Sequence, residues 1–304
     1  NQFDYQSCLC YLQVNFMQQL KLFIELTRLK KPIGYMLLFW PCSWGMAYAY
    51  ANNQNTNLFI YYLLLFFLGS ILMRSAGCIF NDIVDKDLDK KVKRTRDRPI
   101  ASGLVSTKRG LIYVLFLCAL AFLILIQFNK ITIILGLCSM LLAFSYPFMK
   151  RLTYWPQLFL GLTFNWGAVM AWTSLTGYIS LEIVFLYIAA IFWTLGYDTI
   201  YGAQDIEDDE IIGVKSTSIK FKKNLKLFVI CSYSISISLL ILIFLKSFGF
   251  NLQTLMILGF FISLFYQVQM VKITDPKTCM KAFKINGLSG FLLFFGILLN
   301  SMAV

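Results

Sequence analysis

Residues 58–80 read LFIYYLLLFFLGSILMRSAGCIF, a stretch in which Arg74 is the single charged side chain. A bilayer-spanning helix needs about 20 predominantly apolar residues, and a run of this length is improbable in a soluble protein. The apolar residues are continuous and do not alternate with polar ones, which favours a helix over a strand of a membrane barrel. The stretch therefore predicts a transmembrane helix.

Similar stretches recur along the whole 304-residue chain. The candidate spans are 33–50, 58–80, 111–128, 131–148, 157–175, 179–199, 225–246, 252–271 and 285–303. Only 14% of the residues are charged and the mean hydropathy is +0.69, whereas about a quarter of a soluble domain is charged. We predict an all-α polytopic membrane protein with about nine transmembrane helices around a central cavity. Residues 21–304 would form one membrane domain, after a cytoplasmic tail of residues 1–20.

Lysine and arginine are distributed unevenly between the predicted connections. With a cytoplasmic N-terminus, 25 of the 27 basic residues are assigned to the cytoplasmic side when Arg74, inside the second predicted span, is counted with the connection that follows it, and only Lys130 and Lys246 fall outside. Such an excess is typical of cytoplasmic loops. The net charge of +12 therefore indicates topology rather than nucleic-acid binding. The first 20 residues resemble neither a signal peptide nor a transit peptide. Together with a lysine-, isoleucine- and asparagine-rich composition, this favours a bacterial inner (plasma) membrane over the mitochondrial inner membrane.

The residue types present exclude several kinds of site. The chain contains no histidine, which excludes Ser-His-Asp and Cys-His catalysis. We interpret the eight cysteines as small core residues rather than as a disulfide framework. Cys8 and Cys10 lie close together, but no histidine is available to complete a mixed zinc site. The absence of a GxxxxGK[ST] phosphate loop argues against nucleotide hydrolysis.

Two acidic clusters follow the second and the sixth predicted spans, on the same side of the membrane. On a helix, Asn81, Asp85 and Asp89 would project from one face. The second cluster repeats such a spacing at Asp198, Asp205 and Asp209. Like charges stacked on a helix near a membrane are unfavourable, so a shared divalent cation is the economical explanation. Oxygen ligands without histidine favour Mg²⁺ or Mn²⁺ over zinc, although solvated loop acids would show the same pattern.

Basic residues stand next to both clusters. They are Lys93, Arg94 and Arg98 after the first cluster, Lys215 after the second, and Arg151 on the fourth-to-fifth connection. Guanidinium groups bind phosphate oxygens through paired hydrogen bonds, and lysines supply a compact charge. Arg151 could instead be a simple positive-inside anchor. Acids and bases at the mouth of an apolar bundle predict a site for a diphosphate with an apolar tail.

The motifs closely resemble those of the UbiA superfamily of intramembrane prenyltransferases. The NDxxDxxxD motif of that family is matched at Asn81, Asp82, Asp85 and Asp89, and its DxxxD motif at Asp205 and Asp209, after YDTIY at Tyr197–Tyr201. The 4-hydroxybenzoate polyprenyltransferase branch is indicated by KPIG at Lys31–Gly34, RSAGC at Arg74–Cys78, VKRTRDRP at Val92–Pro99, YPFMKR at Tyr146–Arg151, GVKST at Gly213–Thr217 and KAF at Lys281–Phe283. The resemblance extends from about residue 20 to the last residue.

The resemblance implies a Mg²⁺-dependent transfer of a polyprenyl group from polyprenyl diphosphate to 4-hydroxybenzoate, at the ring carbon ortho to the hydroxyl. Diphosphate would be released, and the product would serve ubiquinone synthesis. The metal set would be Asn81, Asp82, Asp85, Asp89, Asp205 and Asp209, of which Asp85, Asp89, Asp205 and Asp209 would be catalytic. Tyr197, Asp198, Lys93, Arg94, Arg98, Arg151 and Lys215 would contact the diphosphate or the acceptor, and the division between these two tasks stays open.

Other functions remain as alternatives. A UbiA-type enzyme of the menaquinone, tocopherol, chlorophyll or haem O branch would carry the same acidic motifs, although the lack of histidine disfavours haem O synthesis. A cation-coupled transporter would place acids near the middle of the spans, whereas nearly all acids here lie at one membrane face. A soluble isoprenyl diphosphate synthase also has paired aspartate motifs, but nine apolar spans exclude that class.

Overall fold

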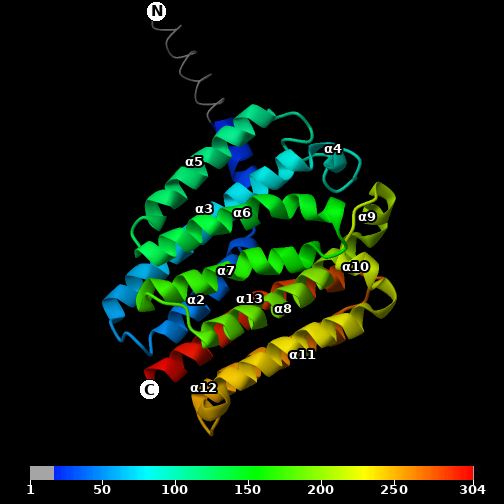
Figure 1. Cartoon of the computed structure of the whole chain (residues 1–304). Helices are drawn as coiled ribbons and strands as arrows, with labels where there is room; N and C mark the ends of the chain where they lie inside the picture. Colours follow the sequence, from blue (N-terminus) through cyan, green and yellow to red (C-terminus); the bar gives the residue numbers. More distant parts are fainter. Residues whose placement is uncertain (1–16, 304) are drawn as a thin grey trace, which may run out of the picture.

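The computed structural model describes residues 17–303, so Cys8, Cys10 and most of the expected N-terminal tail lie outside the described residues. Within this range the chain is helical and contains no strand (Figure 1). Residues 17–27 are helical. The long helices are α2 (Ile33–Ala49), α3 (Thr56–Val84), α5 (Thr107–Leu125), α6 (Lys130–Leu152), α7 (Pro156–Thr176), α8 (Leu181–Gly202), α11 (Leu225–Phe244), α12 (Leu252–Met270) and α13 (Pro276–Met302).

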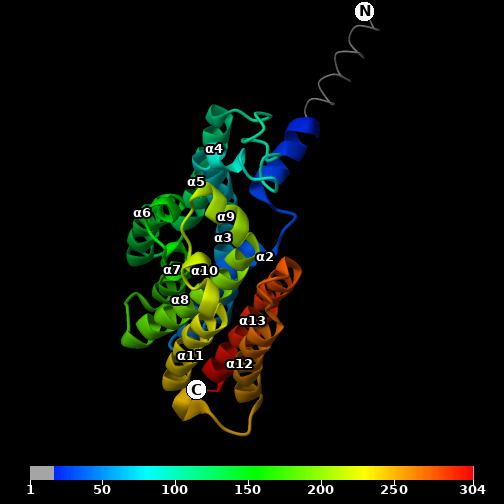
Figure 2. The ribbon, with the colours of Figure 1, turned by 90° about the vertical axis from the view of Figure 1, so that its right-hand side faces the viewer.

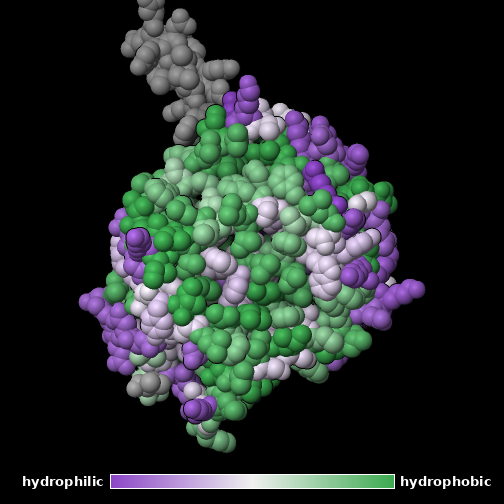
Figure 3. Space-filling view, viewed as in Figure 1, coloured by the Kyte–Doolittle hydropathy of each residue, from purple (hydrophilic) through white to green (hydrophobic). Residues whose placement is uncertain are grey.

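The long helices have the length and surface of membrane spans. Eight helical segments of the described chain are at least 18 residues long and apolar enough to cross a bilayer, and α2 adds a ninth of 17 residues. Large apolar side chains are exposed along them, and Figure 3 shows a face dominated by such residues, with hydrophilic side chains gathered toward its margins. The polytopic all-α architecture expected from the sequence is confirmed.

Local sequence signals set where several helices begin. Asn55, Ser106, Asn129, Ser180 and Asn251 each accept a hydrogen bond from a backbone N–H in the first turn of α3, α5, α6, α8 and α12. These caps satisfy amides that lack a partner inside the helix. The first turns of these five helices are therefore fixed by side chains that the sequence itself provides.

Two groups of helices enclose a space between them. A buried core joins α2, α7, α8 and α13, where the rings of Trp44 and Trp193 lie 4.8 Å apart and Trp193 Nε1 donates to Asn286 Oδ1 at 2.8 Å. A second, smaller core joins α3 and α5 around Ile79 and Val114. Figure 2 shows α5 and α6 on the opposite side of the molecule from α12 and α13. The space between the two groups is lined mainly by α3, α5, α6 and α7.

The acidic motifs lie where helices change direction. Helix α3 continues past the expected end of its span to Val84, and Asp85 then ends it before the short α4 (Lys86–Asp89). Helix α8 is followed by the 3₁₀ turn η1 (Ala203–Asp205) and by α9 (Ile206–Ile212). Asn81, Asp85 and Asp89 stay linked by i→i−4 backbone hydrogen bonds of 2.8 Å across this break. The second motif is instead divided among α8, η1 and α9, so its members do not share one continuous helix. The short helices α4 and α9 lie at the same end of the bundle (Figure 1).

The membrane orientation is a testable expectation. We expect Ser102→Cys and Lys223→Cys, both at exposed positions on the side of α4 and α9, to be protected from a membrane-impermeant thiol reagent in intact bacterial cells. Lys130→Cys and Lys246→Cys, on the opposite connections, should be labelled because few basic residues are retained outside. All four changes are made in a background without native cysteines. The reverse labelling pattern would contradict the orientation.

Candidate active site

A cavity of about 1820 Å³ opens between the helix groups and holds both acidic motifs at one end. Its polar end is formed by the last turns of α3, by α4 and the connection after it, and by η1 and α9. Its walls farther in come from α3, α5, α6 and α7 and are mainly apolar. The cavity therefore has the polarity expected of a site for an ionic head and an apolar tail.

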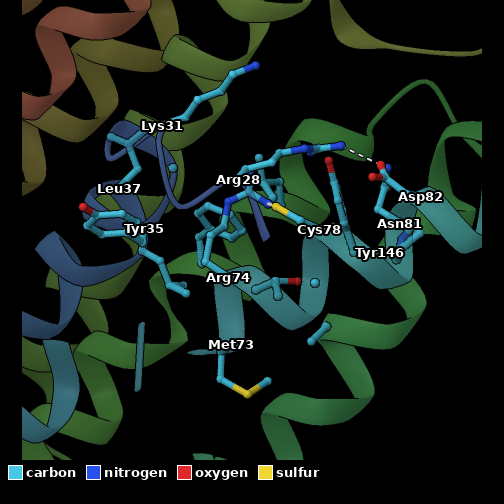
Figure 4. Close-up of a pocket in the computed structure, with 18 of the residues that line it drawn as sticks. Arg28, Lys31, Tyr35, Leu37, Met73, Arg74, Cys78, Asn81, Asp82 and Tyr146 are labelled. Atoms are coloured by element: carbon cyan, nitrogen blue, oxygen red, sulfur yellow. Dashed lines mark hydrogen bonds and ion pairs between the residues drawn. The ribbon is translucent and has the colours of Figure 1, made fainter. Parts of the chain in front are cut away.

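Asp82 forms the inner edge of the first motif. Its side chain is only 3% exposed and its Oδ1 lies 2.6 Å from Arg28 Nη2 and 3.2 Å from Arg98 Nη1. The same Arg98 nitrogen lies 2.8 Å from Asp89 Oδ2. Figure 4 shows Arg28 reaching Asp82 from the N-terminal segment. Two arginines from separate segments thus compensate the two buried carboxylates.

Asp85 ends α3 and is also buried. Lys150, from the end of α6, forms an ion pair with Asp85 Oδ2, which also accepts a hydrogen bond from Asn81 Nδ2 at 2.8 Å. The guanidinium of Arg151 lies 3.5 Å from Asp85 Oδ1 and donates to the carbonyl oxygen of Val84 at 2.6 Å. The end of α6 therefore holds the end of α3 in place.

The second motif faces the first across the cavity mouth. Arg94, from the connection after α4, pairs with Asp205 Oδ2 at 2.9 Å. The backbone N–H of Lys215 donates to the carbonyl oxygen of Lys150 at 2.8 Å, and Asp209 lines the same mouth. Residues more than 100 positions apart in the sequence are thus brought to one site.

Arg28 occupies an unusual backbone conformation. Its φ is 54°, the only positive value for a residue other than glycine among the described residues, and such a conformation is uncommon for a bulky side chain. Burial disfavours the charged form of Arg28, but Cys78, Asp82 and other acidic groups nearby raise the pKa of its guanidinium above the ordinary value. The residue is therefore charged at any physiological pH and fixed to the cavity mouth.

A second polar group lies deeper, at the level of the middle of α3. Arg74 Nη1 lies 2.9 Å from Cys78 Sγ, and its guanidinium carbon lies 5.6 Å from the centroid of the Phe164 ring. Its buried Nε has no hydrogen-bond partner, and no carboxylate of the described chain lies within 4.0 Å of it. Asp198 and Tyr197 line the cavity, and Asp198 interacts electrostatically with Arg74. Figure 4 shows Arg74 beside Cys78, on the same helix as Asn81 and Asp82.

The structure brings most of the expected residues together. Those that line the cavity are Asn81, Asp82, Asp85, Asp89, Arg94, Arg98, Tyr197, Asp198, Asp205, Asp209 and Lys215. Lys93 is exposed and does not line the cavity, and Arg151 contacts Asp85 from outside it. Arg28, Arg74, Tyr146 and Lys150 also line the cavity. Sequence reasoning did not assign these four residues to the site, although the RSAGC and YPFMKR stretches contain three of them.

The donor chemistry of the mouth fits a hard divalent cation. The candidate ligands are carboxylates and the Asn81 side-chain amide, all oxygen donors of the kind that Mg²⁺ prefers. Asp85 Oδ1 is buried without a hydrogen-bond partner, so it retains a lone pair for another ligand. The described residues contain no preformed group of three or more acidic side chains close enough to share a metal. Basic side chains hold these acids instead.

Replacing Arg151 by lysine tests whether the α6 end supports the site. The planar guanidinium faces the Val84 carbonyl and the Asp85 carboxylate at once, which a single ammonium group does not reproduce. We expect Arg151→Lys to lower kcat/KM about tenfold, or about 1.4 kcal/mol. Arg96→Lys, at an exposed position that does not line the cavity, is the control. Unchanged kinetics with both substrates would mean that Arg151 acts only as a positive-inside anchor.

Comparison with known proteins gives one consistent result. Residues 38–295 match the UbiA prenyltransferase family. The chain is 41% identical over 293 residues to the mitochondrial 4-hydroxybenzoate polyprenyltransferase of Arabidopsis thaliana, covering 93% of this chain and 69% of that protein. It is 38% identical over 288 residues to the 4-hydroxybenzoate octaprenyltransferase of Vibrio atlanticus, covering 92% of this chain and 97% of that protein.

Solved structures share the fold at lower identity. The apo structure of a UbiA homolog from Aeropyrum pernix K1 is similar with a TM-score of 0.73 and 23% identity, covering 88% of this chain and 98% of that chain. A UbiA homolog from Archaeoglobus fulgidus bound to GPP and Mg²⁺ is similar with a TM-score of 0.68 and 16% identity. The similarity covers 91% of this chain and 99% of that chain.

Proposed function

The chain belongs to the UbiA prenyltransferase family, and from this premise we propose that it transfers a polyprenyl group from polyprenyl diphosphate to 4-hydroxybenzoate. The product would serve ubiquinone synthesis in an inner membrane, and residues 21–304 would form the catalytic membrane domain. The observation that carries the proposal is the single cavity that joins two acidic motifs, a deeper arginine and an apolar arm. Relatives named for this reaction, at about 40% identity, support it.

The polar end of the cavity is the proposed diphosphate site. Asn81, Asp82, Asp85, Asp89, Asp205 and Asp209 would hold Mg²⁺ there, and the ion would neutralise charge on the leaving diphosphate. Arg94, Arg98 and Lys150 line the same end and can bind diphosphate oxygens directly. When a phosphate oxygen replaces a carboxylate as their partner, the acids become available to the cation. Between turnovers, the basic residues thus neutralise the negative charge of the buried acids.

Arg74 is the proposed partner of the acceptor carboxylate. It lies on α3 between the acidic motif and the apolar arm, and no carboxylate of the described chain pairs with it. The basic residues nearer the mouth, Arg28, Arg94, Arg98 and Lys150, are all paired with acids. A guanidinium matches a benzoate carboxylate bidentately. This division assigns the outer cations to the diphosphate and the inner one to the aromatic acid.

In the transfer, the allylic C–O bond breaks and its electron pair leaves with the diphosphate oxygen. The ring carbon ortho to the hydroxyl forms the new C–C bond and then loses its proton. Asp198, which lines the cavity near Arg74, is placed to accept a proton. Apolar walls exclude water, which would otherwise capture the allylic cation. The ring of Phe164 lies in the same part of the cavity and presents a face that can stabilise positive charge.

An acceptor panel tests this proposal. Detergent-solubilised protein is assayed with geranyl diphosphate and Mg²⁺ against 4-hydroxybenzoate, 1,4-dihydroxy-2-naphthoate and homogentisate. We expect prenylated product from 4-hydroxybenzoate alone, because only this acceptor places a carboxylate opposite the phenol on a single small ring. Product from another acceptor in preference to 4-hydroxybenzoate would assign the chain to a different branch of the family. Omission of the diphosphate is the control for background.

A further inference from the structure

The short segment between α9 and α11 carries a dense group of lysines. It consists of α10 (Thr217–Lys220) and the 3₁₀ turn η2 (Lys222–Asn224), and Figure 2 shows α10 between α9 and α11. Its exposed lysines, together with one in the first turn of α11, are Lys220, Lys222, Lys223 and Lys226. Only Lys222 has a carboxylate of the described chain within 4.0 Å, that of Glu210. Three of the four lysines therefore present positive charge without an acidic partner.

The backbone beneath these lysines is held in place. Ser216 caps α10 with its side chain. The backbone N–H of Thr217 donates to Gln157 Oε1 at 3.0 Å, and Ser218 Oγ donates to the carbonyl oxygen of Thr199 at 2.8 Å. All five of these residues are buried, so one side of the segment is fixed to α7 and α8 while the lysines face outward. A surface on a fixed backbone loses little conformational entropy when it binds a ligand.

An aromatic surface lies directly beneath Lys220. The rings of Phe221 and Phe228 are stacked with their centroids 4.0 Å apart, and the ring of Trp155 lies 5.8 Å from that of Phe221. Lys220 Nζ lies 4.6 Å from the centroid of the Trp155 ring. None of these four residues lines the central cavity. Tryptophan is enriched at the headgroup level of membranes, so this surface is separate from the candidate active site and lies where lipid headgroups are expected.

Exposed apolar side chains continue from the lysines along α11. Lys226 lies in the first turn of this helix, and Leu227 and Ile230 are 59% and 45% exposed. Lysine stems lie along apolar surface while their ammonium groups reach the polar layer. The surface thus has positive charge and aromatic rings at one level and an apolar helix face below them. This order matches a molecule with an anionic head and acyl chains.

We propose that an anionic glycerophospholipid binds at this surface, which we call the α10 basic surface and which is formed by Trp155, Lys220, Phe221, Lys223 and Lys226. The phosphate diester lies among the ammonium groups, and the acyl chains lie along α11. Phosphatidylcholine fits poorly, because its choline adds a cation to a surface that is already positive. An acidic protein segment would pair with the lysines but leave the exposed apolar face of α11 without a partner. The site does not depend on the proposed reaction.

Replacing the unpaired lysines tests the site. Purified protein in detergent is titrated with phosphatidylglycerol or with phosphatidylcholine of the same acyl chains, and bound lipid is measured by native mass spectrometry. We expect phosphatidylglycerol to bind at least tenfold more tightly than phosphatidylcholine. The triple variant Lys220→Gln, Lys223→Gln, Lys226→Gln should lose this preference, since each basic residue near an anionic headgroup contributes roughly fivefold in affinity.

The matched control removes the same charge elsewhere. It is the triple variant Lys272→Gln, Lys277→Gln, Lys281→Gln, at exposed positions around the start of α13 that do not line the cavity. None of these three lysines lies over an aromatic ring of the described chain. The control should keep the preference for phosphatidylglycerol. Equal binding of the two lipids by the unmodified protein, or equal losses in the two triple variants, would overturn the proposal.

A photolabelling measurement does not require any variant to fold. The unmodified protein, in nanodiscs of phosphatidylcholine, is irradiated with a phosphatidylglycerol that carries a diazirine next to its glycerol headgroup, and the modified peptides are identified by mass spectrometry. We expect label on the peptides that contain Trp155 and Lys220–Phe228, with competition by unlabelled phosphatidylglycerol. Label spread evenly over the outer helix faces, or label at this surface that added phosphatidylcholine removes equally well, would overturn the proposal. A geranyl diphosphate assay in the same preparation reports separately on the proposed function.

Discussion

Asp85→Asn is expected to lower kcat about 10²–10³-fold, equivalent to about 2.7–4 kcal/mol of lost transition-state stabilisation. The substitution keeps the shape of the side chain and the hydrogen-bond partner of Asn81, but removes the negative charge that the proposed cation site needs. Lys150, its ion-pair partner, is one-quarter exposed and can turn to solvent, so the fold should persist. Steady-state kinetics with both substrates, together with thermal unfolding in detergent, measure the two effects separately.

The matched control is Asp87→Asn, because the Asp87 side chain is 88% exposed and does not line the cavity. The second motif offers a parallel pair, Asp209→Asn against Glu207→Gln, in which only Asp209 lines the cavity. EDTA should abolish turnover of the unmodified protein, and Mg²⁺ should restore it. Full activity of Asp85→Asn, or of the unmodified protein in EDTA, would rule out the metal assignment.

Arg74→Met is expected to lower kcat/KM for 4-hydroxybenzoate about 100-fold or more, since truncating one partner of a buried, hydrogen-bonded charge pair costs about 2–5 kcal/mol. The KM for polyprenyl diphosphate should change little, because the outer cations bind that substrate in the proposed site. Measuring each KM at saturating concentration of the other substrate separates the two contributions. Arg96→Met, an exposed arginine outside the cavity, controls for loss of charge alone.

An acceptor without the carboxylate sharpens this test. Phenol has no group for Arg74 to hold, so its low rate of prenylation should be equal in the parent and in Arg74→Met. A variant that loses phenol and 4-hydroxybenzoate activity alike would show that Arg74 supports the cavity rather than the acceptor. A large increase in the KM for the diphosphate would show that Arg74 belongs to the other substrate.

The sequence predicts the architecture of this protein well, because a bilayer restricts a spanning segment to an apolar helix of about 20 residues or to a strand of a closed barrel. Length, apolarity and the placement of basic residues are enough to predict nine spans. Most helices of the structure begin and end within a few residues of the expected positions, but α13 begins at Pro276, nine residues before the expected start at 285, because its first turns carry the polar residues of the cytoplasmic connection. The acidic motifs could also be placed at one end of the bundle, since both follow cytoplasmic ends of spans. Those inferences need only the order of elements along the chain.

The rest of the site depends on contacts between helices that no local pattern encodes. Arg28 and Lys150 resemble the other positive-inside residues in sequence, and only the packing of their segments places them beside Asp82 and Asp85. Lys93 is also a positive-inside residue in sequence, but it lies in the turn that follows α4 and its side chain is exposed. The i, i+4 spacing of Asn81, Asp85 and Asp89 is kept across the end of α3 by backbone hydrogen bonds, whereas the second motif is divided between η1 and α9, which its spacing alone did not predict.

The buried Arg74 has a consequence for how the chain enters the membrane during synthesis. It lies near the middle of α3, where an arginine raises the cost of insertion by about 2.5–3.5 kcal/mol. Asp198, the acid that later interacts with it, is translated 124 positions afterwards, so Arg74 enters the bilayer without that acid. The strongly apolar remainder of the 29-residue α3 offsets this cost. The excess of leucine, isoleucine and phenylalanine in α3 therefore lets the translocon release into the bilayer a helix that carries the proposed binding residue Arg74 within its apolar span.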